Sequence, residues 1–116
     1  MSIFHIFYSD KSIQKKIIYI KSDIKTFIKP LCREHFWIDS YGAYEIDPKS
    51  LVIWICVESD KVKSELESNL DLLNKLKNVL VKYKYPEHAR VHVKIGFESQ
   101  ETVDKESNGN WFHHFK

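Results

Sequence analysis

The sequence has little of several features that would assign a chain to a class at once. It has two cysteines, Cys32 and Cys56, which are too few and too far apart for a disulfide framework or a zinc site. Only Arg33 and Arg90 among its 18 basic residues are arginines, and its formal net charge is +2. Since bidentate capture of phosphates and base edges favours arginine, this composition argues against nucleic-acid readout.

Long apolar segments and targeting signals are also missing. No apolar run approaches the roughly 20 residues that cross a bilayer, and the start "MSIFHIFYSDKS" has neither a basic leader nor a small-residue cleavage site. We therefore expect a cytosolic protein without a signal peptide. Repeats, low-complexity tracts and Gly/Ser linkers are absent from the 116 residues, which predicts one globular domain over 1–116. A hydrophobic content of 43% is ample for its core.

Apolar residues at steps of three and four predict a helix from about Ser9 to about Arg33. Pro30 should kink or end this helix, and two shorter helices that meet near Ser22 are the alternative. The segment from Lys11 to Arg33 has seven basic residues and one acidic residue, so the outer face of the helix should be strongly positive.

The middle of the chain changes its periodicity. Residues 41–46 are typical of a strand, "DPKS" has the composition of a turn, and the continuous apolar run 51–57 predicts a central strand. A second helix should then begin at a cap, Ser59 or Asp60, carry a leucine-rich stripe from Val62 to Tyr83, and stop at Pro86.

The last third alternates between apolar and polar residues over "ARVHVKIGFE", which predicts a strand over 89–98. Asn108-Gly109 favours a two-residue turn, and 111–115 would then form a short last strand. These elements predict an α+β fold: a mostly antiparallel sheet of four to five strands packed against one or two helices. The step from Val57 to Ala89 could instead add one parallel pair through a right-handed crossover.

Histidine and lysine are the first candidates for chemistry. His92 and Lys94 should share the outer face of their strand, with His113 or His114 on the closing strand. A metal-independent nuclease needs such a base, an acid and a cation for the phosphate. The alternative is that these residues are solvated positions of an exposed sheet face. His88 and His92 have helical spacing but should lie on a turn and a strand, so we predict neither a metal site nor a cofactor.

Nucleophiles and calcium ligands give weaker signals. The sequence has no Gly-x-Ser-x-Gly elbow and no glycine-rich phosphate loop. Cys56 lies within "LVIWICV" and should be a core residue, as should Trp54, while Cys32 should be a structural thiol. The acidic residues near the C-terminal end do not have the alternating spacing and central glycine of a calcium loop.

The end of the chain, "ESQETVDKESNGNWFHHFK", combines acidic and aromatic residues. It forms either a solvated acidic loop or an acidic patch that docks a basic partner. Trp111, beside a turn, is typical of an interface rim, because tryptophan contributes strongly to binding energy. The candidate partner-binding residues are Glu98, Glu101, Asp104, Glu106, Trp111 and His113.

The segments "LVIWICVESD" and "FESQETVDKESNGNWFHHFK" resemble small bacterial cytosolic proteins of the kind that serve as immunity partners of polymorphic or contact-dependent inhibition toxins. The likeness covers about a quarter of the chain. It implies a protein that binds and blocks a toxin domain, has no catalysis of its own, and shares no fixed fold with other immunity proteins.

Three hypotheses therefore stand. The first is a non-enzymatic immunity-type inhibitor, whose carboxylates would mimic the phosphates bound by a basic nuclease toxin. The positive helix face would repel such a partner unless it lies on the opposite side of the protein. The second is a small nuclease that uses the histidines and Lys94. The third is a nucleic-acid module that uses the lysines from Lys11 to Lys29.

Overall fold

The computed structural model describes residues 2–115, and its side chains from residue 13 onward. Within that range the sheet has three strands, in the order β1-β2-β3. β1 (Phe36–Tyr41) is antiparallel to β2 (Val52–Val57), and β2 is parallel to β3 (Lys94–Ser99). The fold is therefore α+β with a mixed sheet, and the expectation of four to five mostly antiparallel strands is wrong.

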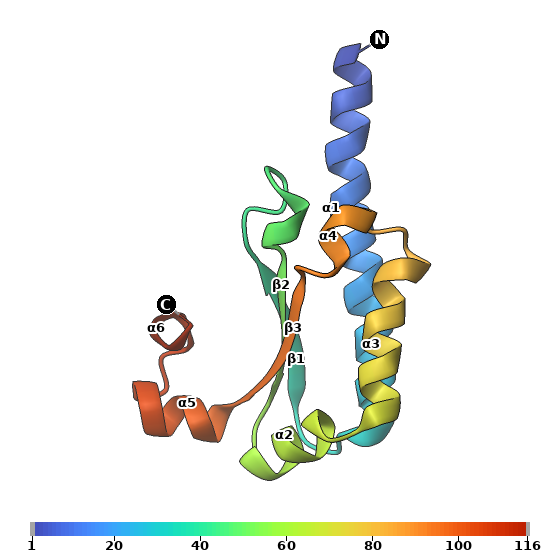
Figure 1. The fold of residues 1–116 in the computed structure, drawn as a ribbon. Coiled ribbons are helices and arrows are strands. Elements are labelled where there is room, and N and C mark those ends of the chain that lie inside the picture. Colours follow the sequence, from blue (N-terminus) through green and yellow to red (C-terminus); the bar gives the residue numbers. More distant parts are fainter. Residues whose placement is uncertain (1, 116) are drawn as a thin grey trace.

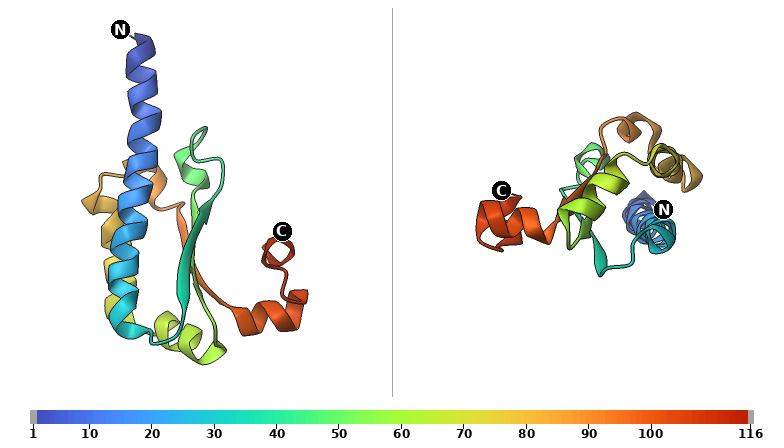
Figure 2. Two further views of the ribbon diagram at one scale, coloured as in Figure 1. Left: turned by 180° about the vertical axis from the view of Figure 1, so that it is seen from behind. Right: turned by 90° about the horizontal axis from the view of Figure 1, so that it is seen from below.

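Helices cover both faces of this sheet (Figures 1 and 2). α1 (Ser2–Ile28) and α3 (Leu70–Lys82) lie on one side. α5 (Gln100–Ser107) and α6 (Trp111–His114) lie on the other. The sheet thus separates the helix that begins the chain from the two helices that end it.

The main core lies between the sheet and the α1–α3 layer. α1 buries Ile17, Ile20 and Ile24 of the apolar stripe that the sequence indicated, and it also buries Ile28. The helix runs through Ser22 without a break and ends where Pro30 starts a 3-10 turn, η1 (Lys29–Leu31). The prediction of one helix ended near Pro30 is confirmed, although it begins well before Ser9.

The second predicted helix is in fact two helices. Ser59 caps α2 (Asp60–Glu67) by accepting a hydrogen bond from the amide of Val62, as expected. A break at Ser68 follows, and Asn69 caps α3 in the same way. Together α2 and α3 connect the parallel strands β2 and β3, so the alternative with one parallel pair is confirmed.

Two predicted strands are displaced. The strand predicted at 41–46 is wrong beyond its first residue: β1 ends at Tyr41, and Gly42 turns the chain with a φ of +107° before η2 (Pro48–Ser50). The predicted strand 89–98 begins only at Lys94, because residues 87–90 form the short helix α4 (Glu87–Arg90). Val91, which was expected to face inward, is 85% exposed.

The C-terminal end differs most from the sequence-based expectation. The predicted acidic loop is helix α5, and the predicted strand 111–115 contains the single helical turn α6. Asn108 and Gly109 both have positive φ, as the turn prediction requires. They end α5 rather than closing a hairpin, because the Asn108 amide donates to the carbonyl oxygen of Val103.

Candidate functional site

The carboxyl ends of the parallel strands β2 and β3 lie together, and a helix begins at each. Ligands of open α/β sheets often bind at this edge. Here two of the protein's own carboxylates already accept hydrogen bonds from the amides at the start of α2. Glu34 accepts hydrogen bonds from the amides of Glu58 and Ser59 at 2.6 and 2.7 Å, and Glu101 accepts from the amide of Asp60 at 3.0 Å. This helix start is therefore not a ready anion site.

Asp60 joins α2 to the start of α5. Its carboxylate accepts hydrogen bonds from the hydroxyl groups of Ser99 and Thr102 and pairs with the ammonium of Lys105 at 2.9 Å. Together these three donors lower the pKa of Asp60 well below its usual value, Ser99 having the largest effect. These contacts hold α5 against the start of α2.

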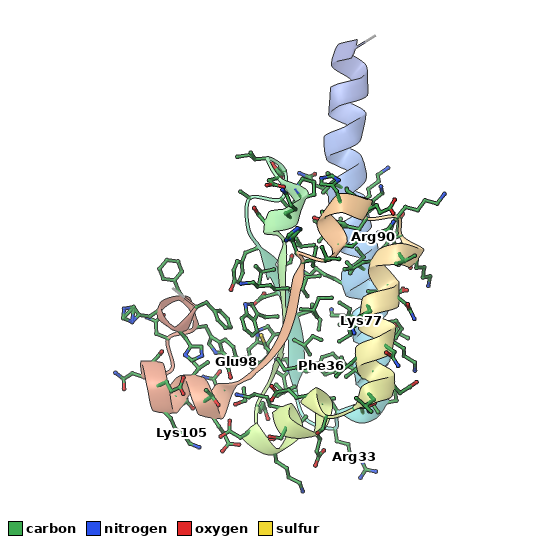
Figure 3. All side chains as sticks on the ribbon, viewed as in Figure 1. Arg33, Phe36, Lys77, Arg90, Glu98 and Lys105 are labelled. Atoms are coloured by element: carbon green, nitrogen blue, oxygen red, sulfur yellow. The ribbon has the colours of Figure 1, made fainter. Side chains whose placement is uncertain are left out.

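Glu98, at the end of β3, is the centre of a second polar group (Figure 3). It is only 8% exposed and accepts hydrogen bonds from Lys63 Nζ at 2.9 Å and from the amide of Ser99 at 2.9 Å. Its other oxygen lies 2.8 Å from Nε2 of His114. Burial opposes ionisation of Glu98, but these partners, Lys63 first, outweigh it and lower the pKa of the carboxyl group.

His114 extends this group to Ser107, whose Oγ lies 3.0 Å from Nδ1 of the ring. We call Lys63, Glu98, Ser107 and His114 the Glu98 cluster. Its serine–histidine–glutamate chain has the order of a catalytic triad, and sequence reasoning missed it, because the contacts depend on how α6 folds back onto the sheet.

The surroundings of Ser107 do not complete a catalytic site. An acyl-transfer enzyme needs amide donors for an oxyanion beside the nucleophile. The amides of Asn108 and Gly109 both donate to the carbonyl oxygen of Val103, and the amide of Asn110 donates to that of Ser107. The arrangement is instead suited to holding α6, since it connects this helix turn to both α5 and β3.

Aromatic rings fill the rest of the interface between α6 and the sheet. Phe115 stacks on Trp54 with centroids 4.6 Å apart, and Trp111 meets Trp37 edge-on at 5.0 Å. Trp54 therefore lies on the second face of the sheet rather than in the main core. Gly96 makes room for it, because a Cβ there would lie 2.6 Å from the Trp54 ring.

The residues predicted to bind a partner are divided between the interior and the surface. Glu101, Asp104 and Glu106 are exposed on α5, and His113 is exposed on α6. By contrast, Glu98 is buried and paired within the chain. Trp111 is half-buried, and its Nε1 donates to Gln100 at 2.8 Å. These last two residues position α6.

The residues of the nuclease hypothesis are not brought together. His92 is exposed in the turn before β3, and Lys94 and His113 are exposed on different elements. No hydrogen bond, ion pair or ring contact joins these three side chains within residues 13–115. His88 lies on α4 rather than on a turn, and among the described side chains no three potential ligands are placed to hold a metal ion.

Both cysteines are buried, as the sequence predicted, and neither is in a disulfide. Burial raises the pKa of the Cys56 thiol to about 12. Burial also raises the pKa of Cys32. A thiol with a raised pKa is a poor nucleophile near neutral pH, which agrees with a structural role for both.

Comparisons with protein-family models, curated proteins and solved structures found no match. Within residues 2–115, no helix combines the length and hydropathy that a bilayer crossing requires.

The carboxylates of this region predict how stability depends on pH. Glu98, Glu34 and Asp60 have lowered pKa values in the folded protein. A lowered folded pKa contributes stability above the unfolded pKa and loses it as the pH falls. We expect urea unfolding followed by circular dichroism to show falling stability below about pH 4.5, the usual glutamate value. Glu98→Gln should show a shallower loss; a slope equal to that of the wild type would contradict this assignment.

Proposed function

We propose that this chain is a non-enzymatic protein-binding domain, specifically an immunity-type protein that binds and neutralises a bacterial toxin domain in the cytoplasm. The observation that carries the proposal is the separation of charge by the sheet. Acidic α5 lies on one side, and the lysine-rich helices α1 and α3 lie on the other (Figure 1). A basic partner can approach α5 without meeting the lysines of α1 and α3, and the single lysine of α5, Lys105, is paired with Asp60.

The acidic side presents a surface formed by α5 and α6. We call it the α5–α6 surface, and it consists of Glu101, Asp104, Glu106, Phe112 and His113. The three carboxylates are exposed on α5, and Phe112 on α6 is 76% exposed. Exposed carboxylates and an exposed apolar ring offer electrostatic steering and an apolar contact, a pairing typical of protein-binding surfaces.

The opposite side of the sheet is basic, and its lysines offset the acidic residues in the net charge of +2. Exposed lysines on α1, η1 and α3 include Lys15, Lys25, Lys29, Lys75, Lys77 and Lys82. In the sequence, the basic face of the first helix was the main argument against phosphate mimicry. Since the sheet lies between these lysines and α5, they do not weaken the field that a partner of α5 would meet at short range.

The Glu98 cluster supports this proposal indirectly. Glu98 holds His114 on α6, and Trp111 packs the same turn onto Trp37. A helix turn fixed by a buried carboxylate–imidazole contact and by aromatic ring contacts presents its exposed residues in one arrangement, and a preorganised surface loses less entropy on binding. No observation favours the nuclease alternative, which needs convergent histidines.

A charge-reversal experiment tests the proposal. We expect Asp104→Lys/Glu106→Lys to reduce capture of the partner from native cells about tenfold or more, because like charges across an interface cost several kcal/mol. Glu101 is left unchanged because it binds the amide of Asp60. The measurement is quantitative mass spectrometry of a tagged pull-down, followed by a test of whether co-expression relieves the toxicity of the captured protein.

The matched control is Lys25→Glu/Lys29→Glu, which reverses two exposed charges on the opposite side of the sheet. This variant should capture the partner as the wild type does. The proposal fails if no stoichiometric partner is found, if both double variants lose it equally, or if the captured protein is not toxic on its own.

A further inference from the structure

The side of α1 that faces away from the core carries a row of residues at steps of three and four. Among the described side chains, this row consists of Lys15, Ile18, Ser22, Lys25 and Lys29. We call it the outer row of α1, although Lys29 lies in η1, directly after the helix. All five side chains are exposed, whereas the isoleucines of the opposite side are buried. The helical spacing therefore places the row on one face, turned away from the sheet.

The outer row combines free cations with an exposed apolar residue. Within residues 13–115, the ammonium groups of its three lysines take part in no hydrogen bond or ion pair. Ile18 lies between these lysines and is 63% exposed. The one acidic residue of 11–33, Asp23, is already paired with Lys82 at 2.7 Å. The row is thus a positive surface with an apolar side chain within it.

The helix continues past the rest of the protein. α1 has 27 residues and is about 40 Å long at 1.5 Å per residue, against roughly 20 Å for the six-residue strands. Figures 1 and 2 show its first turns extending beyond the sheet, α3 and α4. In the sequence these turns contain residues 3–8, "IFHIFY", which are aliphatic or aromatic except for His5. The spacing of the outer row also continues back through Lys11 and Tyr8 to Phe4.

This combination fits the surface of an anionic lipid bilayer. Lysines along a helix attract anionic headgroups, and neighbouring aromatic and aliphatic residues enter the boundary between headgroups and acyl chains. A single such signal binds a membrane only weakly, and two together bind it stably. Nucleic acid fits less well, because it makes no use of an exposed isoleucine and favours arginine over lysine. A second copy of this chain also fits poorly, since pairing two outer rows would bring their lysines together.

We propose that α1 binds the surface of an anionic membrane. The outer row lies along the headgroups, and residues 3–8 enter the boundary of the acyl chains. The helix lies on the bilayer and does not cross it, so this mode of binding requires no membrane span. It is independent of the proposed function, because α1 and the α5–α6 surface lie on opposite sides of the sheet. The protein can therefore hold a membrane and a protein partner at the same time.

The probe is a vesicle of equal parts phosphatidylcholine and phosphatidylserine, sedimented with the whole protein at increasing lipid concentration. Vesicles of phosphatidylcholine alone should bind about tenfold more weakly or less, because they carry no net charge. Lys25→Glu/Lys29→Glu should weaken binding to the mixed vesicles about tenfold or more. The matched control, Lys61→Glu/Lys94→Glu, reverses two exposed lysines of α2 and β3 and should bind as the wild type does. Circular dichroism of each variant confirms that it is folded.

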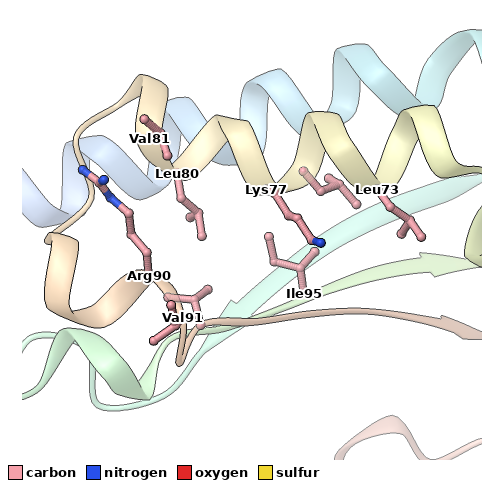
Figure 4. A pocket seen from close by; sticks show the side chains of 9 residues that line it. Leu73, Lys77, Leu80, Val81, Arg90, Val91 and Ile95 are labelled. Atoms are coloured by element: carbon pink, nitrogen blue, oxygen red, sulfur yellow. The ribbon is translucent and has the colours of Figure 1, made fainter.

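The apolar contribution is tested separately. Ile18→Ser should weaken binding to the mixed vesicles about fivefold or more, because an isoleucine no longer leaves water. Its control is Val91→Ser. Val91 is 85% exposed and lines an apolar groove between α3 and β3 (Figure 4), and none of the side chains drawn around that groove belongs to α1. This control should not change binding, whereas Phe4→Ser/Phe7→Ser should weaken it about tenfold or more.

Several results would overturn the proposal. They are failure to bind the mixed vesicles, equal binding to phosphatidylcholine alone, equal losses for the two lysine pairs, or equal effects of Ile18→Ser and Val91→Ser. Tighter binding of a fluorescein-labelled single-stranded oligonucleotide through Lys25 and Lys29 would assign the row to nucleic acid instead. A sedimenting dimer that Phe4→Ser/Phe7→Ser dissociates would assign residues 3–8 to a second copy. Loss of the captured protein partner concerns the α5–α6 surface alone and leaves these vesicle measurements unchanged.

Discussion

Replacement of Glu98 by alanine is expected to lower the free energy of unfolding by about 3 kcal/mol, at the low end of the range for breaking a buried ion pair. Glu98 is 8% exposed, and its partners Lys63 and His114 have side chains that are 21% and 10% exposed. Without the carboxylate, the ammonium of Lys63 and the ring of His114 lose their partner while remaining largely out of water. Urea denaturation at pH 7, followed by circular dichroism, measures the effect.

Glu106→Ala is the matched control for this substitution. Its carboxylate lies 3.8 Å from the same histidine, but its side chain is 65% exposed. We expect a change within about 0.5 kcal/mol, as for most surface substitutions. Equal losses for Glu98→Ala and Glu106→Ala would mean that burial of the pair, and thus the Glu98 cluster, does not stabilise the fold.

Gly42→Ala is expected to cost about 3 kcal/mol or more, from strained backbone and a steric clash together. Gly42 has a φ of +107°, which residues with a side chain rarely adopt. A Cβ at this position would lie 1.9 Å from the carbonyl oxygen of Ser50, a backbone atom. The connection between β1 and β2 must therefore shift before alanine can be accommodated.

Gly109→Ala separates these two causes. Gly109 also has a positive φ, +80°, but the nearest atom to a Cβ there is a side-chain oxygen of Asp104 at 3.1 Å. We expect this substitution to cost about 1–2 kcal/mol from backbone strain alone. Thermal or urea unfolding of both variants gives the comparison. If Gly109→Ala were as costly as Gly42→Ala, the contact with Ser50 would not be the source of the difference.

Structural features that depend only on residues near one another in the sequence were predicted correctly. The isoleucine stripe of α1, the Ser59 cap and the continuous apolar strand β2 each depend on nearby residues alone. The parallel pairing of β3 was identified only as an alternative, because a helical connection between two strands permits it without requiring it.

The missed elements show where local patterns are ambiguous. "ARVHV" alternates as a strand does, yet Ala89 is buried within α4 and Val91 points into solvent, because five residues fit either periodicity. The Ser99 cap of α5 was present in the sequence, since its hydroxyl accepts from the amide of Thr102. The preceding strand pattern led us to interpret the acidic residues as a loop.

The candidate site was predicted in part. Glu101, Asp104 and Glu106 were expected to be exposed, and they are. Glu98 was grouped with them because an alternating strand places it outward. It does point away from the main core, but α5 and α6 fold over that face and enclose it with Lys63. Only tertiary structure distinguishes a surface carboxylate from one beneath a second layer.

The placement of the aromatic residues has a consequence for optical measurements on this protein. Its three tryptophans, Trp37, Trp54 and Trp111, all belong to the interface between the sheet and the segment from 111 to 115. The core between the sheet and α1 contains none of them. Intrinsic fluorescence therefore reports the docking of the C-terminal turn, whereas circular dichroism reports the helices of the main core. If the unfolding transitions followed by fluorescence and by circular dichroism did not coincide, the two layers would be unfolding one after the other.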